Sequence, residues 1–274
     1  MTILMGVTTP MSDLAPDADS EPVEPLEFSA SERMRRPDQR RDLSPDRRNP
    51  DRMRPLRTPP RYDGLAEWYD ANIGPYAEAA GLELLALLGP GSGRCLDLAC
   101  GSGINLRRLT DAGWSVTGVD ISGDQLRLAR RRAPQGVDLV QADAIQLPFE
   151  DASFDAVACS LLHTDVDDFA AILREAAGVL RPDGRLAYVG IHPCFVGPFA
   201  RNPPAEPPEL HPGYRNTAWT TEGFSDGIRR RAGARHVPLA ELLNAFLAAD
   251  LRLVRISEAG DEDFPTRIGI LAKR

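Results

Sequence analysis

RCLDLACGSG, residues 94–103, is the stretch that decides the fold. Its apolar part stops at small residues, and an amphipathic segment follows at 104–112, so the stretch predicts a buried strand, a tight turn and the start of a helix. Gly101 and Gly103 have no Cβ atoms, which lets a ligand lie against the backbone of the turn. The unpaired N–H groups of the helix favour a carboxylate or phosphate there. We therefore expect a nucleotide-like ligand at the carboxyl edge of a sheet.

Strand and helix patterns alternate on both sides of this turn. Strands are predicted at 94–99, 115–120, 137–141, 154–159 and 185–191, and helices at 104–112, 124–132 and 167–180, the second behind Ser122 as N-cap. Two amphipathic helices precede them, within 62–70 and 75–88. A helix at 238–249 and strands at 251–257 and 266–272 close the chain as an antiparallel hairpin. The alternation predicts an α/β fold with a doubly wound, mostly parallel sheet.

The two remaining regions differ in composition from this domain. Residues 1–58 pass from acidic to Arg- and Pro-rich and hold few apolar side chains, which predicts a disordered N-terminal arm ahead of a domain at 59–274. The alternative is a basic arm that contacts RNA or an acidic partner. Residues 192–237 are Pro-rich and irregular, too long for an ordinary connection, and predict a lid or substrate loop.

Composition limits the classes of function. The chain has 274 residues and a formal net charge of -8, which argues against non-specific binding to nucleic acid. No segment has the pattern of a secretory signal or a membrane span. The four cysteines form neither a CxxC pair nor a zinc module and predict reduced thiols in a cytoplasmic protein: Cys95, Cys100, Cys159 and Cys194.

Three carboxylates accompany three successive predicted strands. Asp97 lies inside the first strand, Asp120 ends the second, and Asp143 ends the third. A carboxylate at the position of Asp120 can accept hydrogen bonds from both hydroxyls of a ribose, and one at Asp143 can accept from the amine of a base. Leu106 stands where the third glycine of the dinucleotide fingerprint would fall. The pattern indicates a ligand with several donors and a positive region.

In this order, six segments resemble the class I S-adenosylmethionine-dependent methyltransferases, particularly the small-molecule enzymes that include quinone-biosynthesis C-methyltransferases. The segments are LDLACGSG at 96–103, GVDIS at 118–122, QADA at 141–144, LPF at 147–149, SFDAV at 153–157 and LRPDGRL at 180–186. The resemblance covers residues 62–191 and continues more weakly to 273. It implies a seven-stranded, mostly parallel, Rossmann-like sheet with a terminal antiparallel strand, S-adenosylmethionine as cofactor and a small-molecule acceptor.

The resemblance also implies roles for individual residues. Gly101 and Gly103 would pack against the methionine part of the cofactor, Asp97 would hold its amino end, Asp120 the ribose, and Asp143 with the Ala144 N–H the adenine. Ala99 replaces a glycine that often begins this turn, and it is not expected to be a contact if its position does not need a positive φ. The expected cofactor-binding set is Tyr69, Asp97, Gly101, Gly103, Asp120, Ile121, Asp143, Ala144 and Ser160.

The sequence offers two candidates for the general base. His163, after the fourth strand, and His192, at the end of the fifth, are candidate catalytic residues, because histidine titrates in the useful range. For each, the alternative is a histidine that caps a helix or packs under the lid. A metal site is not expected, because His192, His211 and His236 have no compact ligand spacing.

Aromatic and basic residues of the lid have two interpretations. Tyr214, Trp219 and Phe224 are either the lining of an aromatic acceptor pocket or anchors of the lid. Arg229, Arg230, Arg231 and Arg235 either contact an anionic substrate or form a solvated turn.

The sequence thus predicts methyl transfer from S-adenosylmethionine to a small molecule. The first alternative is a non-catalytic S-adenosylmethionine-binding module that works through a partner. An RNA methyltransferase is disfavoured by the net charge and by CSLL at 159–162, where an Asn/Asp-Pro-Pro-Tyr/Phe motif would stand. An NAD-binding dehydrogenase is disfavoured by the missing glycine, by Asp143 and by the closing strand pair. The sequence predicts neither the acceptor nor an oligomeric state.

Overall fold

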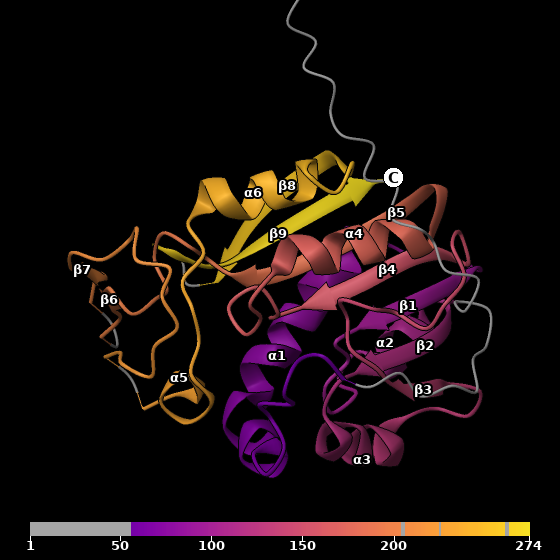
Figure 1. Ribbon diagram of the computed structural model, residues 1–274, viewed down its shortest axis with the longest axis horizontal. Coiled ribbons are helices and arrows are strands. Elements are labelled where there is room, and N and C mark those ends of the chain that lie inside the picture. The colour runs from indigo at the N-terminus through magenta and orange to yellow at the C-terminus, as the bar shows by residue number, and fades with distance from the viewer. Residues whose placement is uncertain (1–55, 204–205, 225, 261–262) are drawn as a thin grey trace, which may run out of the picture. The chain divides into compact units, whose positions relative to one another are not determined.

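Seven strands form one sheet in the order β3-β2-β1-β4-β5-β9-β8. The computed structural model describes residues 56–203, 206–224, 226–260 and 263–274 (Figure 1). Strands β1 (Arg94–Leu98), β2 (Ser115–Asp120), β3 (Asp138–Gln141), β4 (Phe154–Ser160) and β5 (Leu180–Ile191) run parallel. Strand β9 (Pro265–Lys273) is antiparallel to both β5 and β8 (Arg252–Gly260). The predicted sheet is confirmed, and its strand order reverses between β1 and β4.

Two apolar layers cover the two faces of the sheet. On one face, α1 (Ala66–Leu88), α2 (Leu106–Asp111) and α3 (Gly123–Arg132) supply side chains to a buried cluster that includes Leu84, Leu109 and Leu126. On the other face, α4 (Phe169–Val179) and α6 (Leu239–Leu247) contribute Leu173 and Phe246 to a second cluster. Because successive side chains of a strand point to opposite faces of the sheet, the parallel strands contribute to both clusters.

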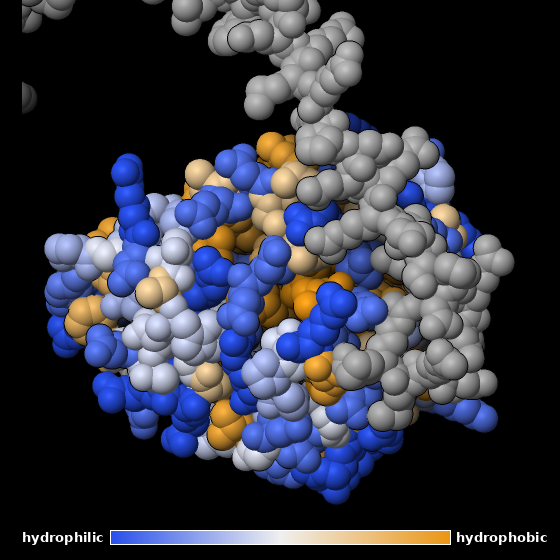
Figure 2. Space-filling model, in the orientation of Figure 1, coloured by the Kyte–Doolittle hydropathy of each residue, from blue (hydrophilic) through white to orange (hydrophobic). Residues whose placement is uncertain are grey.

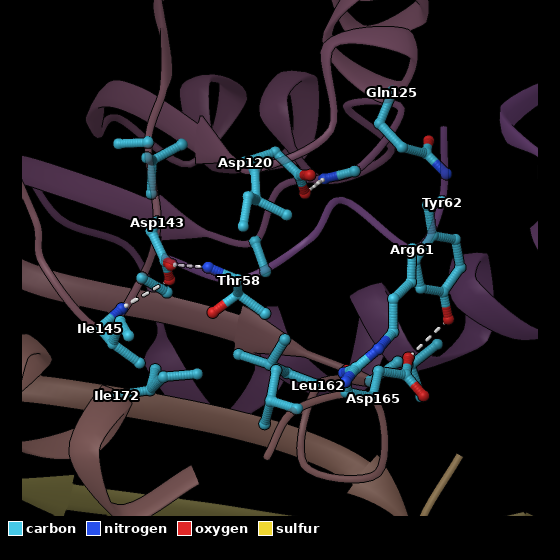
Figure 3. A pocket seen from close by; sticks show the side chains of 18 of the residues that line it. Thr58, Arg61, Tyr62, Asp120, Gln125, Asp143, Ile145, Leu162, Asp165 and Ile172 are labelled. Atoms are coloured by element: carbon cyan, nitrogen blue, oxygen red, sulfur yellow. Dashed lines mark hydrogen bonds between the residues drawn. The ribbon is translucent and has the colours of Figure 1, made fainter. Parts of the chain in front are cut away.

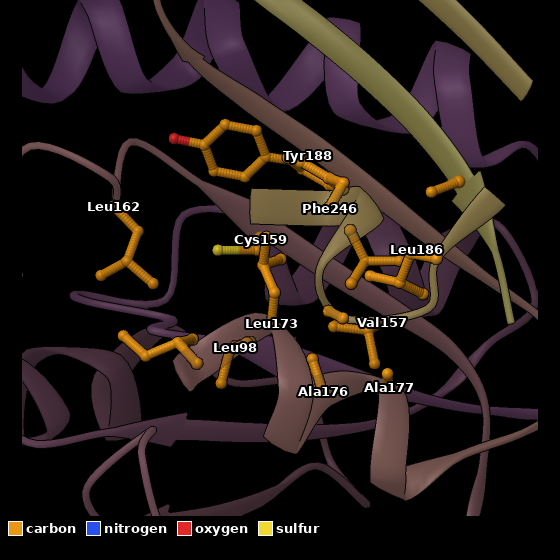
Figure 4. Packing of buried hydrophobic residues seen from close by; sticks show 14 of the residues in the cluster. Leu98, Val157, Cys159, Leu162, Leu173, Ala176, Ala177, Leu186, Tyr188 and Phe246 are labelled. Carbon is orange, nitrogen blue, oxygen red and sulfur yellow. The ribbon is translucent and has the colours of Figure 1, made fainter. Parts of the chain in front are cut away.

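The second cluster is closely packed. Tyr188 on β5 lies with its ring centroid 5.9 Å from that of Phe246, among aliphatic side chains from α4 and β4 (Figure 4). Val157 on β4 belongs to this cluster, whereas its neighbours Ala156 and Ala158 belong to the other. Both faces of β4 are therefore buried, as in the central strand of a parallel sheet.

The N-terminal helical region corrects one expectation. The segments 62–70 and 75–88 were each expected to hold a helix, but Ala66–Leu88 is a single helix with Pro75 inside it. Proline removes one backbone donor and clashes with the Cβ atom of the residue before it. Here that residue is Gly74, which is buried and has no Cβ to clash with the proline ring. The helix therefore continues through the proline.

The segment 192–237 contains little regular structure. It holds the short pair β6 (Ala200–Arg201) and β7 (Glu209–Leu210) and the single turn α5 (Ile228–Ala232). Phe199 packs against Tyr214 and His236 inside it. The Arg235 N–H donates to the Thr164 carbonyl oxygen, which ties the segment to the loop after β4. The segment thus lies beside the carboxyl end of that strand.

Two further observations concern the described surface. Apolar side chains lie in a hollow near the centre of the face seen in Figure 2, between hydrophilic ones. None of the described helices is both long and apolar enough to cross a membrane. Of the predicted arm, residues 1–55 lie outside the described residues.

Candidate functional site

The turn after β1 has three residues in the left-handed region. Gly101 and Gly103 have φ values of 53° and 81°, and Ala99 has a φ of 57°. The premise of the Ala99 prediction is therefore wrong, because its position does adopt a positive φ; Ala99 also lines a cavity. A left-handed conformation costs an L-residue about 1–2 kcal/mol. This cost explains why a glycine often begins the corresponding turn.

The two glycines of the turn have different surroundings. A Cβ on Gly101 would meet its nearest atom, Gln125 Oε1, at 3.9 Å, so the space beside Gly101 is open. A Cβ on Gly103 would lie 2.8 Å from Leu106 Cδ1 and 3.1 Å from Ala129 Cα. Gly101 therefore leaves room at the cavity, whereas Gly103 allows the turn to pack against α3.

Asp120 joins the ends of β1 and β2. Its Oδ2 accepts a hydrogen bond of 2.8 Å from the Gly101 N–H, and its Oδ1 accepts one of 2.9 Å from the Ser122 N–H. Burial raises the pKa of Asp120, and these two bonds oppose that rise. The carboxylate faces the first cavity with lone pairs still able to accept (Figure 3).

Asp97 is a buried carboxyl with an unsatisfied oxygen. The side chain is 1% exposed, and its Oδ2 has no hydrogen-bond partner. Burial, with a smaller contribution from the charge of Asp120, raises the pKa of Asp97 to about 8. A cationic group that reached Asp97 would satisfy the oxygen and favour the ionised form.

Asp143 contacts the beginning of the described chain. Its Oδ1 accepts from the Ile145 N–H at 3.2 Å, while its Oδ2 accepts from the Arg57 and Thr58 N–H groups at 3.2 and 2.9 Å. Thr58 also lines the first cavity beside Asp143 (Figure 3). The last residues of the predicted arm therefore lie against this end of the cavity.

The first cavity has a volume of about 290 Å³ and lies at the carboxyl ends of β1, β2, β3 and β4. Asp97 and Gly103 are not among its lining residues. Seven of the nine expected cofactor-binding residues do line it: Tyr69, Gly101, Asp120, Ile121, Asp143, Ala144 and Ser160. The strand-end pattern thus brings most of the expected set together.

A second cavity, of about 580 Å³, lies between α1 and the segment 192–237. Its aromatic lining residues are Tyr62, Tyr69, Tyr76 and Phe224, and its charged or polar ones include Thr164, Asp165, Arg201, Asn202 and Arg229. Trp219 and Tyr214 are not among the described residues that line it. Trp219 instead stacks under the Arg61 guanidinium at 3.8 Å, and the Tyr214 hydroxyl accepts from the Leu239 N–H.

Four described residues line both cavities and form a wall that they share: Tyr62, Tyr69, Leu161 and Asp165. Asp165 was not expected from the sequence. Its Oδ2 accepts from the Tyr62 hydroxyl at 2.6 Å, and its Oδ1 accepts from the Thr164 hydroxyl at 3.0 Å. Burial raises the pKa of Asp165 to about 6, against these bonds and the charges of Arg229 and Arg61. The one feature of the sequence that could have indicated Asp165 is its position just after the predicted fourth strand, β4.

Both candidate histidines are buried. His163 is 1% exposed, its Nδ1 lies 2.5 Å from the Tyr188 hydroxyl, and burial lowers its pKa to about 3. His192 is 2% exposed, its Nδ1 accepts from the Cys194 N–H, and its Nε2 lies 2.7 Å from Glu258 Oε1. The hydrogen bonds thus assign the Nε2–H tautomer to His192. Both of its ring nitrogens are engaged.

Among the residues that the structure describes, no group of three or more His, Cys, Asp or Glu side chains is placed to hold a metal ion. His211 stacks on Phe224, and burial lowers the pKa of His236 to about 4. The four cysteines are free thiols.

Residues 96–188 match the family described as methyltransferase domain. The chain is 39% identical over 107 residues to a demethylmenaquinone methyltransferase of Renibacterium salmoninarum, covering 39% of this chain and 44% of that protein. It is 33% identical over 144 residues to a 2-phytyl-1,4-naphtoquinone methyltransferase of Trichormus variabilis, covering 50% and 62%. The matches thus span about half the length of the curated relatives.

Solved structures show the same fold. An S-adenosylmethionine-dependent methyltransferase from Mesorhizobium loti superposes with a TM-score of 0.59 at 24% identity, over 77% of this chain and 99% of that one. The strand order with its terminal antiparallel strand, the turn after β1 and the match at 96–188 agree with one another. Residues 96–188 thus match a methyltransferase domain, and the chain has the fold of the solved S-adenosylmethionine-dependent methyltransferases.

Proposed function

We propose that this protein transfers a methyl group from S-adenosylmethionine, bound in the first cavity, to a small molecule bound in the second. The observation that carries the proposal is the wall of four residues common to both cavities. Methyl transfer needs donor and acceptor held in line at short range with water excluded. Two cavities that meet at a shared wall, one of them at the strand ends, meet this requirement.

One feature beside the first cavity and one in its lining fit this cofactor. The unsatisfied oxygen of Asp97, buried on β1 outside the lining, suits an amino group that reaches it, and the open space beside Gly101 suits a chain laid against the backbone. Asp120 binds the ribose hydroxyls, and Asp143 accepts from the adenine amine in place of the Arg57 and Thr58 N–H groups. When bound, the cofactor supplies an activated methyl group on a sulfonium. Tyr69, Ile121, Ala144 and Ser160 complete its surroundings.

The acceptor we favour is an aromatic quinol. The named relatives are quinone methyltransferases, and the second cavity is lined by Tyr62, Tyr76 and Phe224. Arg229 also lines it; burial lowers the pKa of this guanidinium against the opposing charge of Asp165, and the guanidinium donates a hydrogen bond to the Ala234 carbonyl. A cation beside aromatic rings favours an acceptor that carries an acidic hydroxyl.

Residues 192–237 act as the lid of this cavity in our proposal. Val196, Gly197, Phe224 and Arg229 all line it from that segment. Closure of such a segment over the acceptor excludes water from the transfer. The alternative, a non-catalytic binding module, would use the first cavity and leave the second without a chemical role.

The test separates binding from turnover. We expect calorimetry to detect binding of S-adenosylmethionine and none of NAD, and mass spectrometry to detect S-adenosylhomocysteine when reduced 1,4-naphthoquinone is supplied. Binding without turnover, for this acceptor and for a small-molecule cell extract, would favour the non-catalytic module. Binding of NAD with no binding of S-adenosylmethionine would refute the cofactor assignment.

A further inference from the structure

We propose that Asp165 is the group that takes the proton from the methyl acceptor. This inference rests on the proposed function, because it assigns a residue to the reaction that the two cavities support. It rests on four observations: the place of the carboxylate between the cavities, its orientation, its charged surroundings, and the engagement of the two histidines.

Its position is the first observation. Asp165 is the acidic member of the four described residues that line both cavities. It stands in the loop directly after β4, the strand next to the point where the strand order reverses. A carboxylate in this wall lies where an acceptor in the second cavity faces a donor in the first. A base must lie within hydrogen-bond reach of the proton that it removes.

Its orientation is the second observation. The Tyr62 hydroxyl donates to Oδ2 (Figure 3), and the Thr164 hydroxyl donates to Oδ1, so both oxygens are held by hydrogen-bonded neighbours. Burial raises the pKa of Tyr62 well above its ordinary value, so Tyr62 remains a donor at neutral pH. A carboxylate oxygen has two lone pairs, and each oxygen therefore keeps one for a proton of the acceptor.

The charged groups around Asp165 are the third observation. Arg229 faces it from α5, and Arg61 from the N-terminal segment, with its guanidinium donating to the Asp165 carbonyl at 3.2 Å. Tyr62, Tyr69 and Asp120 face the same region. Burial nevertheless outweighs the cations, so the carboxyl titrates near 6. Such a group is ionised at neutral pH and close in basicity to the working pH, as efficient general bases are.

The fourth observation is that the two candidate histidines are already hydrogen-bonded. His163 Nδ1 is hydrogen-bonded to the Tyr188 hydroxyl, and the two ring nitrogens of His192 are hydrogen-bonded to the Cys194 N–H and to the Glu258 carboxylate. Neither histidine is among the described residues that line either cavity. Asp165 has the exposure to both cavities that they lack.

The step balances in protons and charge. The acceptor gives its proton to the Asp165 carboxylate and gains the methyl group, while the electron pair of the broken carbon–sulfur bond stays on sulfur. One positive and one negative charge are lost together, which leaves a neutral acid, a neutral sulfide and a methylated acceptor. Asp165 then returns its proton to solvent before the next cycle.

Asp165→Asn tests the proposal with reduced 1,4-naphthoquinone as the acceptor. We expect kcat to fall about 10²- to 10⁴-fold, the usual worth of a general base, with S-adenosylmethionine affinity by calorimetry within threefold of the unchanged protein. Asp165→Glu should restore part of the rate. Asp111→Asn, the same change at an exposed carboxylate of α2, is the matched control. A rate for Asp165→Asn within threefold of wild type overturns the proposal.

The pH dependence supplies a second readout. In wild type, kcat should fall as the pH drops through about 6, because the carboxylate becomes protonated, and this limb should be absent from the residual activity of Asp165→Asn. Carbon-13 NMR of the free protein should show one carboxyl that titrates near 6 and disappears in Asp165→Asn. If wild type fails to turn over reduced 1,4-naphthoquinone, the proposed acceptor fails, and Asp165→Asn is compared with wild type on a small-molecule cell extract, read as formation of S-adenosylhomocysteine. An NMR midpoint near 4 for the Asp165 carboxyl refutes the proposal.

Discussion

The two cavities are built in different ways, although they share a wall. The first is lined mainly by residues at strand ends and turns between Ala99 and Ile172, where the sequence motifs lie. The second is lined by α1, the end of β5 and the segment 192–237. The first cavity follows from local turns in a regular sheet, whereas the second depends on contacts between distant segments. Changes in one should therefore affect a different ligand from changes in the other.

The largest effect is expected for Asp120→Ala in the first cavity. The change removes a carboxylate that we assign to both ribose hydroxyls, and it frees the Gly101 and Ser122 N–H groups. S-adenosylmethionine affinity should fall by about 2–4 kcal/mol, which calorimetry would detect. Asp111→Ala, at an exposed carboxylate, is the control. An unchanged affinity would mean that the ribose lies elsewhere.

The two glycines of the turn should separate ligand contact from packing. Gly103→Ala places a Cβ against Leu106 and Ala129 at a positive φ, so the free energy of unfolding should fall by about 2–3 kcal/mol. Gly101→Ala meets no atom closer than 3.9 Å and should cost only about 1 kcal/mol, from its φ. Urea denaturation measures both. Equal losses would contradict the distinction.

Arg229→Gln should act mainly on the acceptor in the second cavity. It removes the guanidinium that we assign to the acidic hydroxyl of the acceptor, and with it a positive charge that faces Asp165. KM for reduced 1,4-naphthoquinone should rise about tenfold, roughly 1.4 kcal/mol, with S-adenosylmethionine affinity unchanged. Arg230→Gln, at the exposed neighbouring residue, controls for the loss of charge. A loss of cofactor affinity in Arg229→Gln would show that the cavities are not separable.

The smallest expected effect is the release of a proton from Asp97 when the cofactor binds. Because its pKa is about 8 in the free protein, Asp97 is mostly protonated at pH 7. The ammonium of the cofactor should lower this pKa, so binding should release up to about one proton, fewer as the pH rises above 8. Calorimetry in buffers of different ionisation enthalpy measures the release, which Asp97→Asn should abolish. Release that persists in Asp97→Asn would place the amino group away from Asp97.

The same shift affects stability. Folding raises the pKa of Asp97, so the folded protein holds a proton that the unfolded chain loses near pH 4. The free energy of unfolding of the protein without cofactor should therefore fall as the pH rises from about 4 to about 8. Asp97→Asn should show a flatter pH dependence in that range by urea denaturation.

The alternation of strands and helices and most of the first cavity could be predicted from sequence, because each strand ends in a local pattern that survives packing. Asp120 and Asp143 follow from such patterns. Ala99 did not, because nothing in its side chain reveals that the turn needs a left-handed residue there. The site-residue assignments in the cofactor set stay predictions until a ligand is bound.

Asp165 and the second cavity depend on long-range contacts. Tyr62 reaches Asp165 across a separation of 103 residues in the chain. No period or motif in a single sequence records such a contact. The unbroken helix through Pro75 has a different origin, because Gly74, which has no Cβ to clash with the proline ring, stands directly before it in the sequence.

Arg61 connects the edge of the first cavity with the segment 192–237. Its guanidinium stacks on Trp219, pairs with Asp167 and donates to the Asp165 carbonyl, while its side chain lines the first cavity. An acceptor that shifts the segment around Trp219 therefore also moves a group at the edge of the cofactor cavity. The affinities of the two ligands are then coupled by the same factor in both directions. One side chain can in this way impose an order of binding on a two-substrate reaction.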